Sequence, residues 1–193
     1  MRAEAIGRPR SVRASFGIPF PMDVGSRWSA ELGGSTLLDQ GIYPITLALD
    51  VFGAPTEIIA RGRMRADGVD LAEHVTLEFA DGCYAQLAAS MVEFCELTAS
   101  VNGTKGWIAI PTPFWATHTF RTHASGGEPG SFVEGIETAS PVEGNGFGPM
   151  IEHVNAALAA GDLESPIHPF RDTLAVFDVL DAIRAELRVS EPT

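Results

Sequence analysis

Hydrophobic and polar residues alternate with a period of two through the middle of the chain, between Thr56 and Ser140. A period of two puts successive side chains on opposite faces of a β-strand. Short segments such as Asp81-Gly82 break the alternation and are typical of tight turns. The strands predicted in this way are Thr56–Arg65, His74–Phe79, Ala85–Met91, Leu97–Val101, Trp107–Pro111, Thr117–His123 and Ser131–Thr138. Because most connections are short, we expect neighbouring strands to pair antiparallel.

A different spacing, typical of a helix, precedes this region. We expect a helix to begin at Ser35 or Thr36 and to end near Phe52, where a glycine and a proline follow. Pro44 lies inside this helix. Because proline has no backbone N–H, it should kink the helix close to Tyr43.

The rest of the chain completes the predicted fold. Ser11–Phe16 has the pattern of a short strand, and Pro149–Ala160 that of a helix. An amphipathic helix follows, with apolar residues at spacings of three and four: Phe170, Leu174, Phe177, Leu180, Ile183 and Leu187. We therefore predict one α+β domain over residues 1–193, an open and mostly antiparallel sheet with helices on one face.

The strand faces opposite the helices carry a mixed set of side chains, namely Thr76, Tyr84, Gln86, Ala88, Ser90, Thr98 and Ser100. Such a flat surface is either solvated or pairs with the sheet of another subunit. We favour a homodimer through this open sheet face.

Composition excludes several classes of function. The 193 residues carry a formal net charge of −12, which disfavours binding to nucleic acid or to an anionic membrane. No apolar run approaches the roughly 18 residues of a membrane helix, and the N-terminus does not resemble a signal peptide. We expect a cytoplasmic protein. Cys83 and Cys95 are expected in strands as reduced, buried thiols, although their number alone would allow a disulfide.

The most informative segment is Gly33–Gly53, GGSTLLDQGIYPITLALDVFG. Its glycines permit a close approach of the backbone, and a four-residue spacing puts Asp39 and Tyr43 on one helical face. A carboxylate and a phenol placed together form half of an acid–base site. Two simpler interpretations remain open. Asp39 fits a variant of the capping box with Thr36, and Tyr43 fits a core aromatic.

Other candidate groups are sparse. A tyrosine with a pKa of roughly 10 needs a nearby cation to act at neutral pH, and the chain has one lysine, Lys105, in a predicted turn. The five histidines lack metal-ligand spacing, so we expect no metal site. Pro113-Phe114-Trp115 follows a strand, where the two aromatic residues either cover the sheet edge or line a ligand pocket.

Several segments resemble, in order, the C-terminal domain of the glucose–fructose oxidoreductase / inositol dehydrogenase (Gfo/Idh/MocA) family. They are IGRPRSVRASFG, the Gly33–Gly53 segment, HVTLEFADGCYAQLAASM, VNGTKGWIAIPTPFW and GDLESPIHPFRDTLAVFDVLDAIR. A tyrosine at position 43, where inositol dehydrogenases carry histidine, resembles the dihydrodiol and xylose dehydrogenase branch. The resemblance implies that Tyr43 is the acid–base residue, that Asp39 is its partner, and that Trp115 and Phe147 line the substrate pocket.

The same resemblance implies a missing half. Members of the family have an N-terminal Rossmann domain that binds NAD or NADP and carries a catalytic lysine, and neither is matched by this sequence. We therefore expect the substrate-binding and oligomerisation half of an NAD(P)-dependent oxidoreductase acting on a sugar, polyol or diol. The isolated chain should bind no cofactor and be inactive. The alternatives are a stand-alone binding or dimerisation module without catalysis, and a subunit completed by a separate Rossmann chain.

Overall fold

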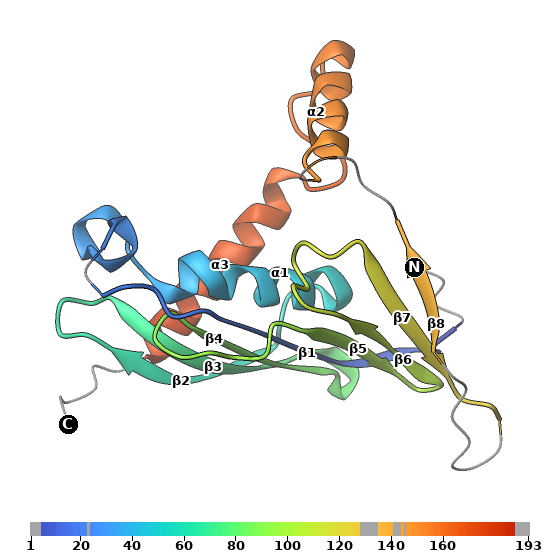
Figure 1. Ribbon diagram of the computed structural model, residues 1–193, viewed down its shortest axis with the longest axis horizontal. Coiled ribbons are helices and arrows are strands. Elements are labelled where there is room, and N and C mark those ends of the chain that lie inside the picture. The colour runs from blue at the N-terminus through green and yellow to red at the C-terminus, as the bar shows by residue number, and fades with distance from the viewer. Residues whose placement is uncertain (1–4, 23, 128–134, 141–143, 145, 188–193) are drawn as a thin grey trace.

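The computed structural model describes residues 5–22, 24–127, 135–140, 144 and 146–187. Its main feature is one sheet of eight strands in the order β2-β3-β4-β1-β5-β6-β7-β8 (Figure 1). The strands are β1 (Pro9–Gly17), β2 (Glu57–Met64), β3 (Asp70–Glu78), β4 (Tyr84–Ser90), β5 (Ala99–Gly103), β6 (Gly106–Ile110), β7 (Thr119–Ala124) and β8 (Ile136–Ala139). The predicted fold class, an open and mostly antiparallel sheet in an α+β domain, is confirmed.

One strand pair in the middle of the sheet is parallel. β1 lies between β4 and β5; it runs parallel to β4, with Ser11 opposite Tyr84, and antiparallel to β5. All other neighbouring strands pair antiparallel. The N-terminal strand therefore joins the β2–β4 and β5–β8 meanders into a single sheet.

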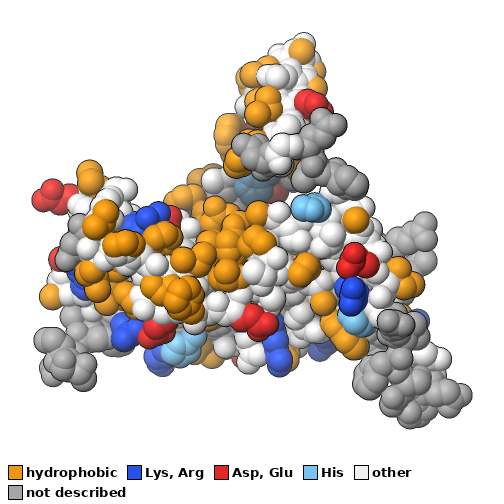
Figure 2. Space-filling view, in the orientation of Figure 1, with side chains coloured by type: hydrophobic (Ala, Val, Ile, Leu, Met, Phe, Trp, Pro, Cys, Tyr) orange, Lys and Arg blue, Asp and Glu red, His pale blue; other side chains and the backbone are white. Residues whose placement is uncertain are grey.

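Two helices cover one face of the sheet and a third stands away from it. α1 (Ile42–Phe52) and α3 (Phe170–Glu186) lie against the sheet, whereas α2 (Gly148–Ala160) projects outward (Figure 1). Figure 2 shows hydrophobic side chains along α2 and gathered over α1 below it. The large apolar side chains exposed on α2, α3 and their connection are Met150, Ile151, Val154, Leu158, Leu163, Ile167, Phe170, Leu174 and Phe177.

The predicted amphipathic helix is confirmed as α3, but only the second half of its apolar stripe is buried. Leu180 and Ile183 are buried as expected, but Phe170, Leu174 and Phe177 are exposed. The reason is the position of the helix, since its first turns extend past the sheet toward α2 and find no strand to cover (Figure 1).

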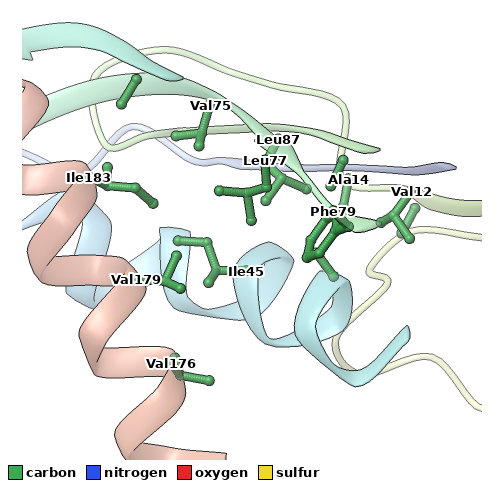
Figure 3. Packing of buried hydrophobic residues seen from close by; sticks show 14 of the residues in the cluster. Val12, Ala14, Ile45, Val75, Leu77, Phe79, Leu87, Val176, Val179 and Ile183 are labelled. Carbon is green, nitrogen blue, oxygen red and sulfur yellow. The ribbon is translucent and has the colours of Figure 1, made fainter. Parts of the chain in front are cut away.

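The core lies between the sheet and these two helices. Ile45 of α1 and Val179 and Ile183 of α3 point toward Val75 and Leu77 of β3 (Figure 3). These side chains are almost completely buried. Alternate residues of β3 and β4 supply the sheet side of the core, which explains the period of two in the sequence.

Both cysteines lie outside the strands, contrary to the prediction. Cys83 directly precedes β4, and Cys95 lies in the loop that follows it. β4 ends at Ser90 because the Ser90 hydroxyl oxygen accepts hydrogen bonds from the N–H groups of Val92 and Glu93, which turns the chain. Both thiols are free; Cys83 is buried and Cys95 half-buried.

The last predicted strand and the search for membrane-spanning helices can be compared with the structure only over the described residues. Part of the predicted strand Ser131–Thr138 lies outside them, and β8 covers its second half. Within the described ranges, no helix has the length and apolar character needed to cross a membrane.

Candidate functional site

The segment before Tyr43 is not a regular α-helix. Helical conformation begins at Thr36, as predicted, but Leu37–Gly41 forms a π-helical turn that continues into α1. Pro44 cannot donate to the carbonyl of Gln40, which removes one hydrogen bond of an α-helix at this point. The irregularity expected near Tyr43 is therefore a wider turn, a feature that is frequent at functional sites.

An acid on a distant strand holds the start of this turn. The carboxylate oxygens of Asp70, the first residue of β3, accept hydrogen bonds from the Ser35 hydroxyl and the Leu37 N–H, each at 2.6 Å. The Thr36 hydroxyl donates to the Asp70 carbonyl at 3.0 Å. The Ser35 hydroxyl oxygen also accepts the Leu38 N–H at 3.1 Å. The cap is therefore part local and part tertiary, and the capping box between Thr36 and Asp39 is not formed.

Asp39 instead forms an ion pair with Arg27. The Nε of Arg27 donates to Oδ2 of Asp39 at 3.1 Å, and the guanidinium lies over the Phe20 ring, 3.7 Å from its centroid. A close backbone contact permits this arrangement. A Cβ atom on Gly34 would lie 2.5 Å from the Arg27 carbonyl oxygen. The close approach suggested by the glycine pair is thus an approach to the Arg27 segment of this chain.

Tyr43 lies in a cluster of aromatic side chains. Its ring centroid is 5.4 Å from that of Phe16 and 6.1 Å from that of Trp115. Phe16 and Trp115 stack face to face at 3.7 Å, and Phe114 meets Trp115 edge-on. Tyr43 remains 43% exposed, so the phenol sits at a surface with aromatic walls.

The structure thus brings together part of the predicted set. Trp115 stands beside Tyr43, while Asp39 and Tyr43 lie on the same helical segment with different partners. Among the described residues no hydrogen bond joins Asp39 to Tyr43, because the carboxylate turns toward Arg27. Phe147 lies directly before α2 and is exposed. Its role as a pocket wall stays a prediction.

Sequence reasoning missed Arg27, Phe16 and Asp70. Arg27 lies in a segment without hydrophobic periodicity, Phe16 had the pattern of an ordinary strand residue, and Asp70 precedes the strand predicted from His74. Lys105, the single lysine, lies in the β5–β6 connection, where its N–H bonds the Ile6 carbonyl. Over the ranges that the structure describes, no three His, Cys, Asp or Glu side chains come together as metal ligands.

The sequence profile of the GFO/IDH/MocA C-terminal domain matches residues 1–109, more than half of the chain. The chain belongs to the GFO/IDH/MocA family. Trans-1,2-dihydrobenzene-1,2-diol dehydrogenase of Xenopus tropicalis is 30% identical over 194 residues, which cover 98% of this chain and 57% of that protein. The enzyme of the same name from Sus scrofa is 32% identical over 202 residues, with the same coverage.

Solved structures of family members have the same architecture. A 3-ketoreductase from Actinomadura kijaniata, a point mutant in complex with TDP-benzene and NADP, superimposes with a TM-score of 0.79 at 28% identity and covers 98% of this chain. An aldose-aldose oxidoreductase from Caulobacter crescentus in complex with glycerol shares the fold, with a TM-score of 0.76 at 24% identity and 96% coverage of this chain. This chain spans 57% and 55% of the length of these two proteins.

Proposed function

We propose that this chain is the substrate-binding half of an NAD(P)-dependent oxidoreductase that acts on a hydroxyl or carbonyl group of a sugar, polyol or diol. The observation that carries the proposal is the position of Tyr43, half-exposed between Phe16 and Trp115 and directly after a π-helical turn. A phenol in such a place can exchange a proton with a substrate hydroxyl, and the flat rings beside it can contact the carbon skeleton.

Each site residue has a separate task. Tyr43 gives or takes the proton at the reacting oxygen. Asp39 and Arg27, paired at 3.1 Å, present charge to the substrate's polar groups. Trp115 and Phe147 form the apolar walls. When bound, a nicotinamide cofactor supplies the acceptor or donor of the hydride.

The cofactor would be held by a second unit. The described strands form no alternating β-α-β arrangement of the kind that binds dinucleotides. The exposed apolar side chains of α2 and α3 require a partner surface. The relatives named above are longer than this chain and extend beyond the matched region. We assign the α2–α3 surface to contact with a nucleotide-binding unit, in the same polypeptide or in a separate chain.

The open face of the sheet is the proposed dimer interface. It is hollowed by a depression of about 1010 Å³, whose lining includes Arg13, Gln86, Ser100, Asn102 and Arg121. Ala88 lies within it, so Ala88→Arg would place a bulky charge on the surface. Light scattering should give a dimer for the wild type and a monomer for Ala88→Arg. A monomeric wild type would contradict the assignment.

Activity and its dependence on Tyr43 test the main proposal. The chain alone should show no NAD- or NADP-dependent turnover of sugars or diols, whereas the chain joined to a family nucleotide-binding unit should be active. Tyr43→Phe should reduce that activity by about 10²–10⁴-fold, since it removes the proton-transfer group. Tyr84→Phe, the other tyrosine, is the matched control and should retain activity. Normal turnover by the isolated chain, or an active Tyr43→Phe variant, would refute the proposal.

A further inference from the structure

Two acids of β3 contact the turn that precedes Tyr43, one at each end. Asp70 accepts the N–H of Leu37 at the start of the turn. Glu73 lies under its last residue, because a Cβ on Gly41 would come within 3.0 Å of the Glu73 Oε1 atom. The same Cβ would lie 3.7 Å from Ala89 of β4. The floor of the turn is therefore made by β3 and β4.

A row of paired residues across β3, β4 and β1 lies beneath both the turn and the Tyr43 ring. Glu73 is paired with Ala89, and Ala89 with Phe16, so the three residues lie side by side across β3, β4 and β1. Gly41 rests on the first two, and the ring of Tyr43 packs against Phe16. A change at Glu73 should therefore move Gly41, and the backbone between Gly41 and Tyr43 should pass this movement on to the tyrosine.

Glu73 is an unusual residue for a core. It is 4% exposed, and neither carboxyl oxygen has a hydrogen-bond partner among the described residues. Burial first, and the nearby Asp70 carboxylate second, raise the pKa of Glu73 well above its usual value. A protonated carboxyl group can donate a hydrogen bond, which a carboxylate cannot. Burying a polar group that only filled space would cost stability, which suggests another role.

We propose that Glu73 is a positioning residue for Tyr43, which supports the Leu37–Gly41 turn from below and fixes the direction in which the tyrosine ring leaves the helix. The inference rests on the proposed function only in giving Tyr43 a catalytic role. Gly41 is the complementary element, since any larger residue would press on the Glu73 carboxyl and on Leu37.

Nuclear magnetic resonance of the full chain with labelled tyrosine tests the placement directly. The chain has two tyrosines, so Tyr84 serves as an internal control in the same spectrum. Glu73→Leu should shift the Tyr43 ring signals and leave those of Tyr84 in place. Glu73→Gln, which stays neutral and keeps a donor, should retain the wild-type Tyr43 signals. A folded Glu73→Leu protein with unchanged Tyr43 signals would overturn the proposal.

A second comparison covers the case in which Glu73→Leu does not fold. Gly41→Ala and Glu73→Ala, which removes the carboxyl that a Cβ at position 41 would meet, form a double-mutant cycle, alone and combined, read out by the same signals. The bulk added at position 41 should shift Tyr43, by an amount that depends on the group at position 73. Strictly additive shifts would overturn the proposal.

Kinetics of the enzyme joined to a nucleotide-binding unit complete the test. Glu73→Leu should lower kcat by up to about 10²-fold with little change in KM, because only the placement of the proton-transfer group is altered. Glu73→Gln should keep kcat near the wild-type value. The spectra report on Tyr43 whether or not turnover occurs. Failure of the positioning role is therefore separate from failure of the proposed function, which the Tyr43→Phe variant tests.

Discussion

The carboxylate of Asp70, at the start of β3, accepts the backbone N–H of Leu37 at a distance of 2.6 Å. A helix normally satisfies its first N–H groups with a side chain from its own N-terminal residues. Here a strand supplies the acceptor for Leu37. Ser35, which accepts the Leu38 N–H in the usual way, also donates to the other oxygen of the same carboxylate. The turn that carries Asp39 and leads to Tyr43 is therefore fixed to the sheet and not only to its own helix.

Replacement of Asp70 should be strongly destabilising. Asp70→Ala leaves the Leu37 N–H and the Ser35 hydroxyl buried without an acceptor, and we expect a loss of about 3 kcal/mol in the free energy of unfolding. Urea denaturation measures it. Asp181→Ala, on the exposed side of α3, is the control and should change stability by less than about 0.5 kcal/mol. Equal effects of the two variants would contradict this role of Asp70.

Much of the sheet could be predicted because its signals are local. Val75, Leu77 and Leu87 are buried, and the neighbouring His74 and Gln86 are exposed, so the alternation in the sequence matches the structure. The place of β1 could not be predicted. Its parallel pairing with β4 joins residues more than seventy positions apart, and no turn signal specifies such a contact.

The site residues also divide into those that local sequence signals reveal and those that only tertiary contacts bring together. The spacing of Asp39 and Tyr43, and the aromatic pair after Pro113, were visible in the sequence. Their partners were not, since Arg27, Asp70 and Phe16 reach the turn through tertiary contacts. A local capping box was one interpretation of Asp39, but Asp70 and Ser35 accept the first backbone N–H groups, which leaves Asp39 available to pair with Arg27.

The Arg27–Asp39 ion pair should contribute little to stability. Its side chains are 35% and 37% exposed, and ion pairs at such positions contribute about 0.2–1 kcal/mol. Arg27→Gln should therefore lower the free energy of unfolding by no more than about 1 kcal/mol, measured in urea. Arg171→Gln, which removes the exposed pair with Asp172, is the matched control. A loss above about 2 kcal/mol for Arg27→Gln would mean that the pair is a main support of the turn.

Trp115 should matter for the surroundings of Tyr43 more than for the fold. Trp115→Leu removes a ring stacked on Phe16 at 3.7 Å, so we expect a loss of about 1 kcal/mol in stability and a clear shift of the Tyr43 ring signals. Trp107→Leu changes a tryptophan on the opposite face, where it stacks on His123, and should leave the Tyr43 signals unchanged. Equal shifts in both variants would argue against a specific aromatic cluster.

Glu73 should make stability depend on pH. Its pKa is raised in the folded protein, so between its ordinary value and the raised value the unfolded chain has released a proton that the folded chain retains. The contribution is fully present below pH 4.5, the ordinary pKa, and is lost as the pH rises toward the pKa of the folded state. Within that window, stability should fall by up to about 1.4 kcal/mol per pH unit.

Glu73→Gln isolates this effect, because the amide does not titrate. The free energy of unfolding, measured in urea at a series of pH values upward from 4.5, should fall for the wild type relative to Glu73→Gln. Glu78→Gln, an exposed position on the same strand, should follow the wild-type curve. A constant difference between wild type and Glu73→Gln at every pH would mean that the carboxyl is charged in the folded protein. Glu73→Gln, which is neutral at every pH, would then no longer imitate the native side chain.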